Sequence, residues 1–414
     1  MKSDVPKSER GWVFGLLIAP YGVLLQGIVQ GGALGYLLSR QGTGSAVQAH
    51  LIGLLSLPSS LYFLWSPLTD FFVRRRTWLL ASALVAALLM WLSFKQPQLS
   101  SSGAVSLAFL AACCGQLVVS SAGGMMGALG SERTRRVASA VYQAGAMGFG
   151  SLSAWVLIYL SERVSRDSLA LTAAALIAVP ALAVFAAPPQ VEITGGSFRG
   201  TMQRVWGEFR ITFFRWDALP YIACMTFPIA TGAAIGLLPG VARQYGVDGD
   251  QVAWINGLLG GLLIAGGAGL MSVVRVVRMP VPVLYMVVAL VNCACLSVLW
   301  LGPLNATIYF VGTLLYMFTV GCCYATFTAV VLEFLADSGK SGSTRYSIIN
   351  SLGNIPVLYM IQVDGWGGER WGGRGLAGAE VVVGGLGALV LLGWLLVRRP
   401  VRLPLASEQA FATE

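Results

Sequence analysis

The chain has 414 residues, of which 56% are hydrophobic and only 11% are charged, and its mean hydropathy is +0.73. About a quarter of the residues in a soluble globular domain are charged, so this composition excludes that class and indicates a polytopic membrane protein. The net charge of +9 is interpreted as a topology signal rather than a nucleic-acid footprint, because basic residues gather in cytoplasmic loops.

Apolar runs of about 20 residues predict membrane-spanning helices. The stretch from Met1 to Arg10 lacks a signal-peptide pattern, so we expect the first run to remain as a helix. The sequence predicts twelve spans, at residues 11–37, 47–69, 77–95, 104–129, 137–160, 167–187, 217–242, 251–273, 280–301, 305–335, 344–363 and 378–397. The expected fold class is therefore an all-α polytopic membrane protein with twelve transmembrane helices in two pseudo-symmetric six-helix bundles.

The basic residues predict the orientation of these spans. With the N-terminus inside, 20 of the 27 basic residues fall in cytoplasmic segments. The other seven face outward: Arg40, Lys95, Arg163, Arg166, Arg243, Arg370 and Arg374. By the positive-inside rule, both termini are expected in the cytoplasm.

A polar stretch halfway along the chain divides the predicted spans into two sets of six. We expect residues 1–187 to form the N-terminal bundle, 188–216 a cytoplasmic linker, 217–398 the C-terminal bundle and 399–414 a cytoplasmic tail. In transporters built from such repeats the substrate binds near the membrane midplane between the halves.

A short charged hinge separates the second and third predicted spans. Asp70 precedes Arg74, Arg75 and Arg76 by four to six residues. We expect Asp70 to pair with Arg74 or Arg75 at the cytoplasmic side and to hold an outward-open state. Exposed ion pairs contribute only about 0–1 kcal/mol each, so such a gate must act as a network on two bistable bundles. The predicted gate consists of Asp70, Arg74, Arg75, Arg76, Arg133 and Arg136.

Polar residues inside the spans are the candidates for substrate binding. An unpaired polar group in hydrocarbon costs several kcal/mol, so each of them needs either an interhelical hydrogen bond or a ligand. The candidates are Tyr21, Gln26, Gln30, Gln116, Ser120, Tyr142, Gln143, Thr226, Asn256, Tyr316, Tyr324, Asn350 and Asn354. Together they predict a cavity with amide, hydroxyl and aromatic walls and almost no fixed charge.

The sequence carries no pattern typical of an enzyme or a metal protein. All seven cysteines fall inside predicted spans without metal-ligand spacing, and His50 is the sole histidine. A phosphate-binding loop is absent from the sequence as well. We therefore expect no catalytic activity, no metal site and no cofactor.

Proton coupling needs a carboxyl group that alternates between wet and dry surroundings. The acids expected near spans are Asp70, Asp217, Glu333 and Asp364, all close to helix ends, with Glu333 the deepest. Glu333 is therefore the candidate proton carrier. A structural role for Glu333 in the gate, and facilitated diffusion without a coupling ion, remain open.

The chain resembles, nearly end to end, the muropeptide (AmpG-like) permeases of the major facilitator superfamily. The stretches that carry the resemblance are Pro20 to Val23, Phe63 to Asp70 with Arg74 to Arg76, Arg243 to Asp248 with Val252 and Asn256, Thr344 to Pro356, and Asp364 to Trp366. It implies a major facilitator fold, secondary transport and a bacterial inner (cytoplasmic) membrane.

The chain departs from those permeases in its core. Where the resemblance places charged residues, it has Leu117, Ser121, Phe227, Ala230 and Gly257. Carboxylates of a peptide-sugar would lack partners in such a pocket. This uncharged core is more similar to that of the related ferric-siderophore permeases for pyochelin and rhizobactin. Aromatic walls can hold a compact aromatic iron chelate with a few hydrogen bonds.

These observations lead to one leading hypothesis and two alternatives. The chain is expected to import a ferric siderophore, a small aromatic iron chelate such as pyochelin, by alternating access. The alternatives are an anhydromuropeptide permease of cell-wall recycling and, from another class, a membrane sensor or scaffold with a transporter fold. The expected partners are a small-molecule substrate, the lipid bilayer and, if transport is ion-coupled, a proton; no nucleic acid is expected.

Overall fold

The computed structural model describes residues 11–65, 68–69, 73–127, 129, 132–187, 198–214, 216–273, 279–335, 348–349 and 351–397. Helices dominate these residues, and none of them forms a strand. The first part of the chain forms α1 (Val13–Leu17), α2 (Ala19–Tyr21), η1 (Gly22–Val29), α3 (Ala33–Arg40), α4 (Ser45–Ser60), α5 (Tyr62–Trp65), α6 (Arg75–Lys95), α7 (Ser102–Gly127), α8 (Glu132–Ser161), α9 (Arg166–Ala181) and η3 (Leu182–Ala186).

The second part repeats this use of long apolar helices and short broken ones. It begins with α10 (Phe198–Phe213), which lies inside the segment expected to be a linker. The elements that follow are η4 (Trp216–Ala218), α11 (Leu219–Thr226), η5 (Ala233–Gly236), α12 (Leu238–Val241), η6 (Ala242–Tyr245), α13 (Gly249–Val252), η7 (Ala253–Leu259), α14 (Gly260–Val273), α15 (Val281–Leu301), α16 (Ala306–Leu335) and α18 (Ile355–Val397).

Among the described residues, eight helices are long and apolar enough to cross a membrane, and a ninth span is possible if the bent pair Val13–Val29 and Ala33–Arg40 is counted as one. The expected all-helical, polytopic membrane fold is confirmed. The count falls short of twelve for a structural reason. Helix α18 covers part of the predicted span 344–363 and all of 378–397, and it kinks at Gly372, whose φ is 67°. Two other predicted spans are broken.

The expectation of one continuous helix over residues 217–242 is wrong. Helix α11 ends at Thr226, and Phe227 adopts an extended backbone because it precedes Pro228. Ala230 and Gly232 then take positive φ values of 50° and 69° before η5 begins. The predicted span 47–69 is also interrupted, since α4 ends at Ser60, two residues after its internal Pro58.

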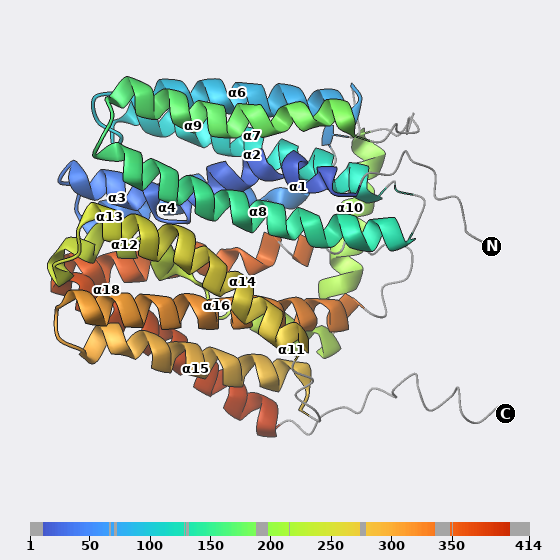
Figure 1. Ribbon diagram of the computed structural model, residues 1–414. Helices are drawn as coiled ribbons and strands as arrows, with labels where there is room; N and C mark the ends of the chain where they lie inside the picture. Colours follow the sequence, from blue (N-terminus) through green and yellow to red (C-terminus); the bar gives the residue numbers. More distant parts are fainter. Residues whose placement is uncertain are drawn as a thin grey trace, which may run out of the picture.

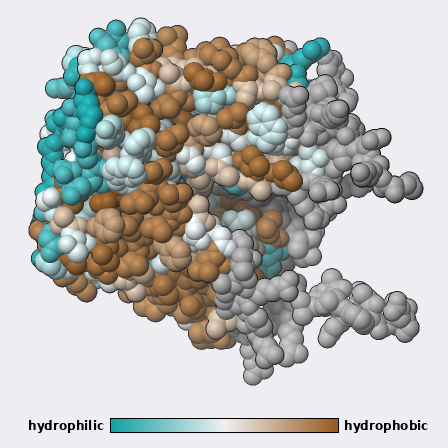
Figure 2. Space-filling model, viewed as in Figure 1, coloured by the Kyte–Doolittle hydropathy of each residue, from teal (hydrophilic) through white to brown (hydrophobic). Residues whose placement is uncertain are grey.

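The helices form two groups that lie side by side (Figure 1). One group contains α1 to α9 and the other contains α11 to α18, and α10 lies across one end of both. We call this end the α10 end, and the opposite end, where α3, α12 and α13 lie, the α3 end. Figure 2 shows apolar side chains over the flanks of the molecule and a polar rim at the α3 end, as expected for a protein that crosses a bilayer.

Small residues allow the two groups to approach closely. A Cβ atom added at Gly257 of η7 would lie 2.7 Å from the Cα atom of Trp155 in α8. Gly35 of α3 similarly abuts the carbonyl oxygen of Gly236 in η5. Backbones in membrane proteins pack together where glycine leaves this space, so these contacts set how tightly the α3 end closes.

Candidate functional site

A cavity of about 1230 Å³ lies between the two groups of helices. Its wall includes Arg75 and Ser139, which lie near the starts of α6 and α8 at the α10 end (Figure 1). Figure 2 shows the surface hollowed between the two groups on the side of α10. The cavity therefore extends from the interior toward the α10 end. Its location matches the site expected for a substrate between two bundles.

The wall of the cavity is polar but almost uncharged. Arg75 is the one charged side chain among the described lining residues. Aromatic side chains come from both groups: Tyr21, Tyr62, Phe63, Tyr142, Phe227, Tyr285, Tyr324 and Phe327. Amide and hydroxyl groups add hydrogen-bonding capacity without fixed charge. This wall can hold a compact molecule with aromatic faces and a few polar atoms.

Nine of the polar residues proposed from the sequence lie on this wall. They are Tyr21, Gln26, Gln30, Ser120, Tyr142, Gln143, Asn256, Tyr324 and Asn354. Three of them also bond to distant segments of the chain. The amide of Gln30 donates to Ser56 Oγ at 3.2 Å, Asn256 Oδ1 accepts from the Tyr309 hydroxyl at 2.9 Å, and Asn354 Nδ2 donates to the Ser59 carbonyl at 3.4 Å.

Three other proposed residues do not line the cavity. Gln116 is buried within the first group of helices, and the Thr226 hydroxyl donates to the Ile222 carbonyl of its own helix at 2.9 Å. The Tyr316 hydroxyl donates instead to a buried carboxylate, Glu380 Oε1, at 2.8 Å. Asn350 lies outside the described residues. Polarity within a span identifies candidates, but it does not reveal which face of the helix they occupy.

The predicted gate lies partly outside the described residues. Asp70 is not described, nor are the side chains of Arg133 and Arg136. Arg75 Nη1 donates to the carbonyl of Gly124 near the end of α7 at 2.6 Å, and the guanidinium of Arg76 donates to the Ala187 carbonyl. Cations at helix C-termini are favoured by the exposed carbonyls there, so these contacts tie the start of α6 to its neighbours. Arg74 is exposed, and the gate stays a prediction.

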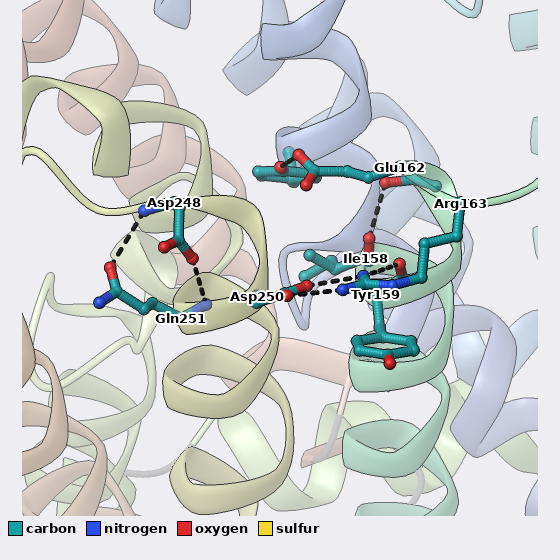
Figure 3. A network of polar contacts seen from close by, with 9 residues as sticks. Ile158, Tyr159, Glu162, Arg163, Asp248, Asp250 and Gln251 are labelled. Atoms are coloured by element: carbon teal, nitrogen blue, oxygen red, sulfur yellow. Dashed lines mark hydrogen bonds and ion pairs between the residues drawn. The ribbon is translucent and has the colours of Figure 1, made fainter.

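The α3 end is closed by contacts between the two groups. Arg163, which follows α8, donates from Nη1 and Nη2 to the two carboxylate oxygens of Asp250 in α13, each at 2.6 Å (Figure 3). The guanidinium also lies 3.8 Å from the centre of the Tyr159 ring. Bidentate geometry and ring stacking favour arginine over lysine here. The hydrogen bond to Asp250 raises the pKa of Arg163.

Local structure positions the Asp250 carboxylate. Asp248 caps α13, accepting from the Gln251 backbone at 2.8 Å, while Gln251 Oε1 accepts from the Asp248 backbone at 3.1 Å (Figure 3). This reciprocal cap fixes the first turn of the helix that carries Asp250. The seal continues where Ser39 Oγ donates to the Gly240 carbonyl at 2.6 Å. The sequence predicts only a topological role for Arg163, although the spacing of Asp248 and Gln251 is typical of a helix cap.

The expectation that Glu333 is the deepest acid is wrong. Glu333 is partly buried in α16, where Oε1 accepts from the Tyr221 hydroxyl at 3.1 Å. Asp364, expected near a helix end, is 0% exposed, and Glu380, which sequence analysis missed, is 4% exposed. Both lie within α18 and face the packed interior. The sequence does contain a signal for Glu380, because it places this carboxyl group inside the apolar run 378–397.

Comparison with known proteins places these observations in context. The model of the Major Facilitator Superfamily matches residues 24–359 of the chain. Similar solved structures include the nucleoside transporter NupG, with 11% identity and a TM-score of 0.66 over 94% of this chain and 98% of that protein. A D-xylose-proton symporter gives 13% identity and a TM-score of 0.65 over 92% and 95% of the two chains.

A third solved structure is a bacterial homologue of the human lysosomal transporter Spinster, in an inward-facing and occupied conformation. It gives 11% identity and a TM-score of 0.59 over 93% of this chain and 94% of that protein. No curated protein matches the sequence. Identities this low establish a shared fold and leave the substrate to be argued from the cavity.

Proposed function

We propose a substrate and a direction of transport for this chain, which belongs to the Major Facilitator Superfamily and is a secondary transporter. The proposed substrate is a ferric siderophore, a compact aromatic iron chelate such as pyochelin. The proposed direction is import across a bacterial inner membrane, from the α3 end to the α10 end. Iron in this proposal is cargo, carried within its organic chelate.

The observation that carries the proposal is the near-neutral aromatic wall of the cavity. With Arg75 as its one charged lining residue among those described, the cavity has few partners for a substrate with several ionised groups. Desolvating such groups without partners costs several kcal/mol each. A chelate that encloses its metal charge and presents aromatic faces avoids most of this cost.

Two residues support the same choice. Phe227 and Ala230 stand where the muropeptide permeases, by the resemblance in sequence, carry charged side chains, and both line the cavity. These two departures alter the cavity wall, whereas Leu117, Ser121 and Gly257 do not line it. Import of anhydromuropeptides is the competing proposal, and Arg75 is the feature that favours it, since one guanidinium can bind one carboxylate.

The orientation is supported by the distribution of basic residues. The start of α6 at the α10 end carries Arg74, Arg75 and Arg76, and the positive-inside rule assigns such clusters to the cytoplasm. Cytoplasmic termini follow from the same rule. In this orientation the cavity faces inward, and the Arg163–Asp250 pair closes the outer side.

Import then requires the α3 end to open and close in turn. Separation of α3 and α8 from η5, α12 and α13 would expose the cavity to the outside, while the hinge before α6 closes the inside. Each contact across the α3 end is individually weak, so the two groups can exchange between discrete packed states. The predicted cytoplasmic gate of Asp70 and its arginines belongs to the outward-open state.

Uptake of ⁵⁵Fe-labelled siderophores by proteoliposomes containing the purified chain tests the proposal. We expect time-dependent accumulation of an aromatic chelate, competed by its gallium complex and not by anhydromuropeptides or nucleosides. Empty liposomes and a charge-introducing Phe227→Lys variant are the controls. Accumulation of anhydromuropeptide with no uptake of any iron chelate would overturn the siderophore assignment. Absence of transport of any solute would favour a sensor or scaffold.

A further inference from the structure

Two carboxyl groups lie buried in the second group of helices, away from the cavity wall. Asp364 and Glu380 are on opposite sides of the Gly372 kink in α18, and they are 0% and 4% exposed. Their carboxyl groups are close enough to interact electrostatically. Two buried like charges repel strongly in a medium of low dielectric constant, so at least one of these groups must carry a proton.

The surroundings of Glu380 suit the ionised form. Its Oε1 accepts from the Tyr316 hydroxyl at 2.8 Å and from the Thr231 hydroxyl at 3.3 Å. Its Oε2 accepts from the backbone N–H of Ala234 at 2.8 Å. Three donors directed at one carboxyl group stabilise its negative charge.

The surroundings of Asp364 suit the neutral form. Both of its oxygens are buried, and the polar group within their reach is the Glu380 carboxyl. An ionised Asp364 would face a second carboxylate with no compensating donor among the described residues, whereas a protonated Asp364 can donate its O–H to Glu380. The first proton of the pair therefore resides on Asp364 in the closed arrangement of the α3 end.

Few other charges bear on the pair. The titratable groups that face it are Tyr316, Tyr324 and Cys323 of α16 and Cys293 of α15. Elements η5 and α12, which pack against α18, carry no titratable side chain. The remaining titratable groups on α4, α11 and η6 are His50, Tyr221, Cys224, Arg243 and Tyr245, and no described basic side chain forms an ion pair with either carboxyl.

Two of the three donors to Glu380, Thr231 and Ala234, belong to the segment that closes the α3 end, whereas the third, Tyr316, is in α16. Thr231 also lines the cavity, and Ala234 is in η5, whose Gly236 carbonyl abuts Gly35 of α3. The chain then continues into α12, where Gly240 accepts from Ser39. Movement of η5 relative to α18 as the α3 end opens would therefore remove the Thr231 and Ala234 donors from Glu380 and leave Tyr316 in place.

We propose that Asp364 and Glu380 form a proton site whose occupancy is linked to opening of the α3 end. With the end closed, Glu380 is ionised and Asp364 is protonated. When η5 moves away from both α3 and α18, Glu380 keeps only the Tyr316 donor and binds a proton from the outer solution. On closure, the Glu380 O–H bond breaks and the proton passes by Thr231 to water in the cavity. The cycle carries one proton in the direction of import.

This inference rests on the proposed alternating access but does not require the siderophore. It is tested on the full chain in nanodiscs by double electron–electron resonance between spin labels at Val164 and Leu304. Both residues are exposed, and they lie in the α8–α9 and α15–α16 connections, which are at the α3 end of opposite groups. The native cysteines are replaced for labelling. One linked proton changes the ratio of open to closed molecules by about tenfold per pH unit, with the open form favoured at low pH.

Three variants separate the outcomes. Glu380→Gln should abolish the pH dependence and hold the molecule in the low-pH distribution, and Asp364→Asn should keep the dependence, because its neutral amide resembles the protonated acid. Glu333→Gln is the matched control, since Glu333 is also part-buried and accepts from a tyrosine, and it should behave as the wild type. Monodisperse elution of each variant verifies folding.

Several results would overturn the proton site. These are a pH response that survives in Glu380→Gln, a response lost only in Glu333→Gln, or a response to sodium at constant pH. Pyranine-loaded proteoliposomes supply a second measurement, in which acidification during uptake should vanish in Glu380→Gln. A pH-dependent opening without siderophore uptake would reject the substrate and retain the proton site. Siderophore uptake that is independent of pH would retain the substrate and reject the proton site.

Discussion

Replacing Gly35 by alanine should open the α3 end. Gly35 lies in α3 directly against the Gly236 carbonyl of η5. A Cβ atom added at Gly35 would lie less than 3.0 Å from that carbonyl oxygen, a separation that real Cβ atoms essentially never show. The obstructing atom is backbone, so a change of side-chain rotamer cannot relieve the clash. Because α3 and η5 belong to opposite groups, only the closed arrangement is penalised.

The magnitude follows from the cost of overpacking, typically about 1–3 kcal/mol. Alanine also stabilises a helix relative to glycine by up to about 1 kcal/mol, but that gain is present in both arrangements and cancels. Since about 1.4 kcal/mol is a factor of ten, the ratio of open to closed molecules should rise about 5-fold to 150-fold.

The assay is the distance distribution between spin labels at Val164 and Leu304, measured at one pH. Gly148→Ala is the matched control, because a Cβ at Gly148 of α8 meets nothing within 4 Å. We expect a longer-distance population in Gly35→Ala and an unchanged distribution in Gly148→Ala. Identical distributions in both variants, with both proteins folded, would refute the assignment of Gly35 to the seal.

Three further predictions concern the seal and the cavity. Asp250→Asn should increase the open population by less than Gly35→Ala, and this increase should shrink at high salt. Asp167→Asn removes the exposed ion pair with Lys95, which lies within one group, and it should leave the open population unchanged; the same spin-label distances check both variants. Gly257→Ala, whose Cβ would lie 2.7 Å from Trp155 Cα, should shift the equilibrium like Gly35→Ala, and Gly266→Ala in the same span, with nothing within 4 Å, should not. Phe227→Lys should lower the initial rate of chelate uptake at least tenfold by placing an unpaired charge on the cavity wall, while Phe227→Leu should lower it only a few-fold; equal rates in the two would contradict a neutral binding surface.

The sequence predicts the part of the site that depends on composition. Apolar runs locate the long helices, and polar residues within them, such as Gln26 and Gln143, identify nine wall residues. Hydrocarbon accepts so few polar groups that each one points to a partner or a cavity. The end of helix α11 at Thr226 is also indicated by the sequence, because Pro228 follows Phe227 and Gly232 lies four residues later.

The parts that escaped prediction depend on contacts between distant segments. Arg163 and Asp250 are 87 residues apart, and neither position alone indicates its partner. Glu380 lies in a glycine-rich apolar run whose local pattern does not say that Ala234 and Tyr316 converge on it. Long-range pairing of this kind becomes apparent only when the two groups are placed together.

The broken seventh span explains why these long-range contacts matter. Ala230 adopts a φ of 50°, a left-handed conformation that costs a residue with a Cβ about 1–2 kcal/mol. Thr231 and Ala234, which follow Ala230 closely in the chain, donate hydrogen bonds to Glu380. Hydrogen bonds to a charged acceptor contribute about 1.5–3 kcal/mol each. The ionised carboxylate can therefore offset the strain at Ala230 and hold η5 in place against α3. Protonation of Glu380 weakens those bonds, and the strain at Ala230 then favours release of η5 and opening of the α3 end.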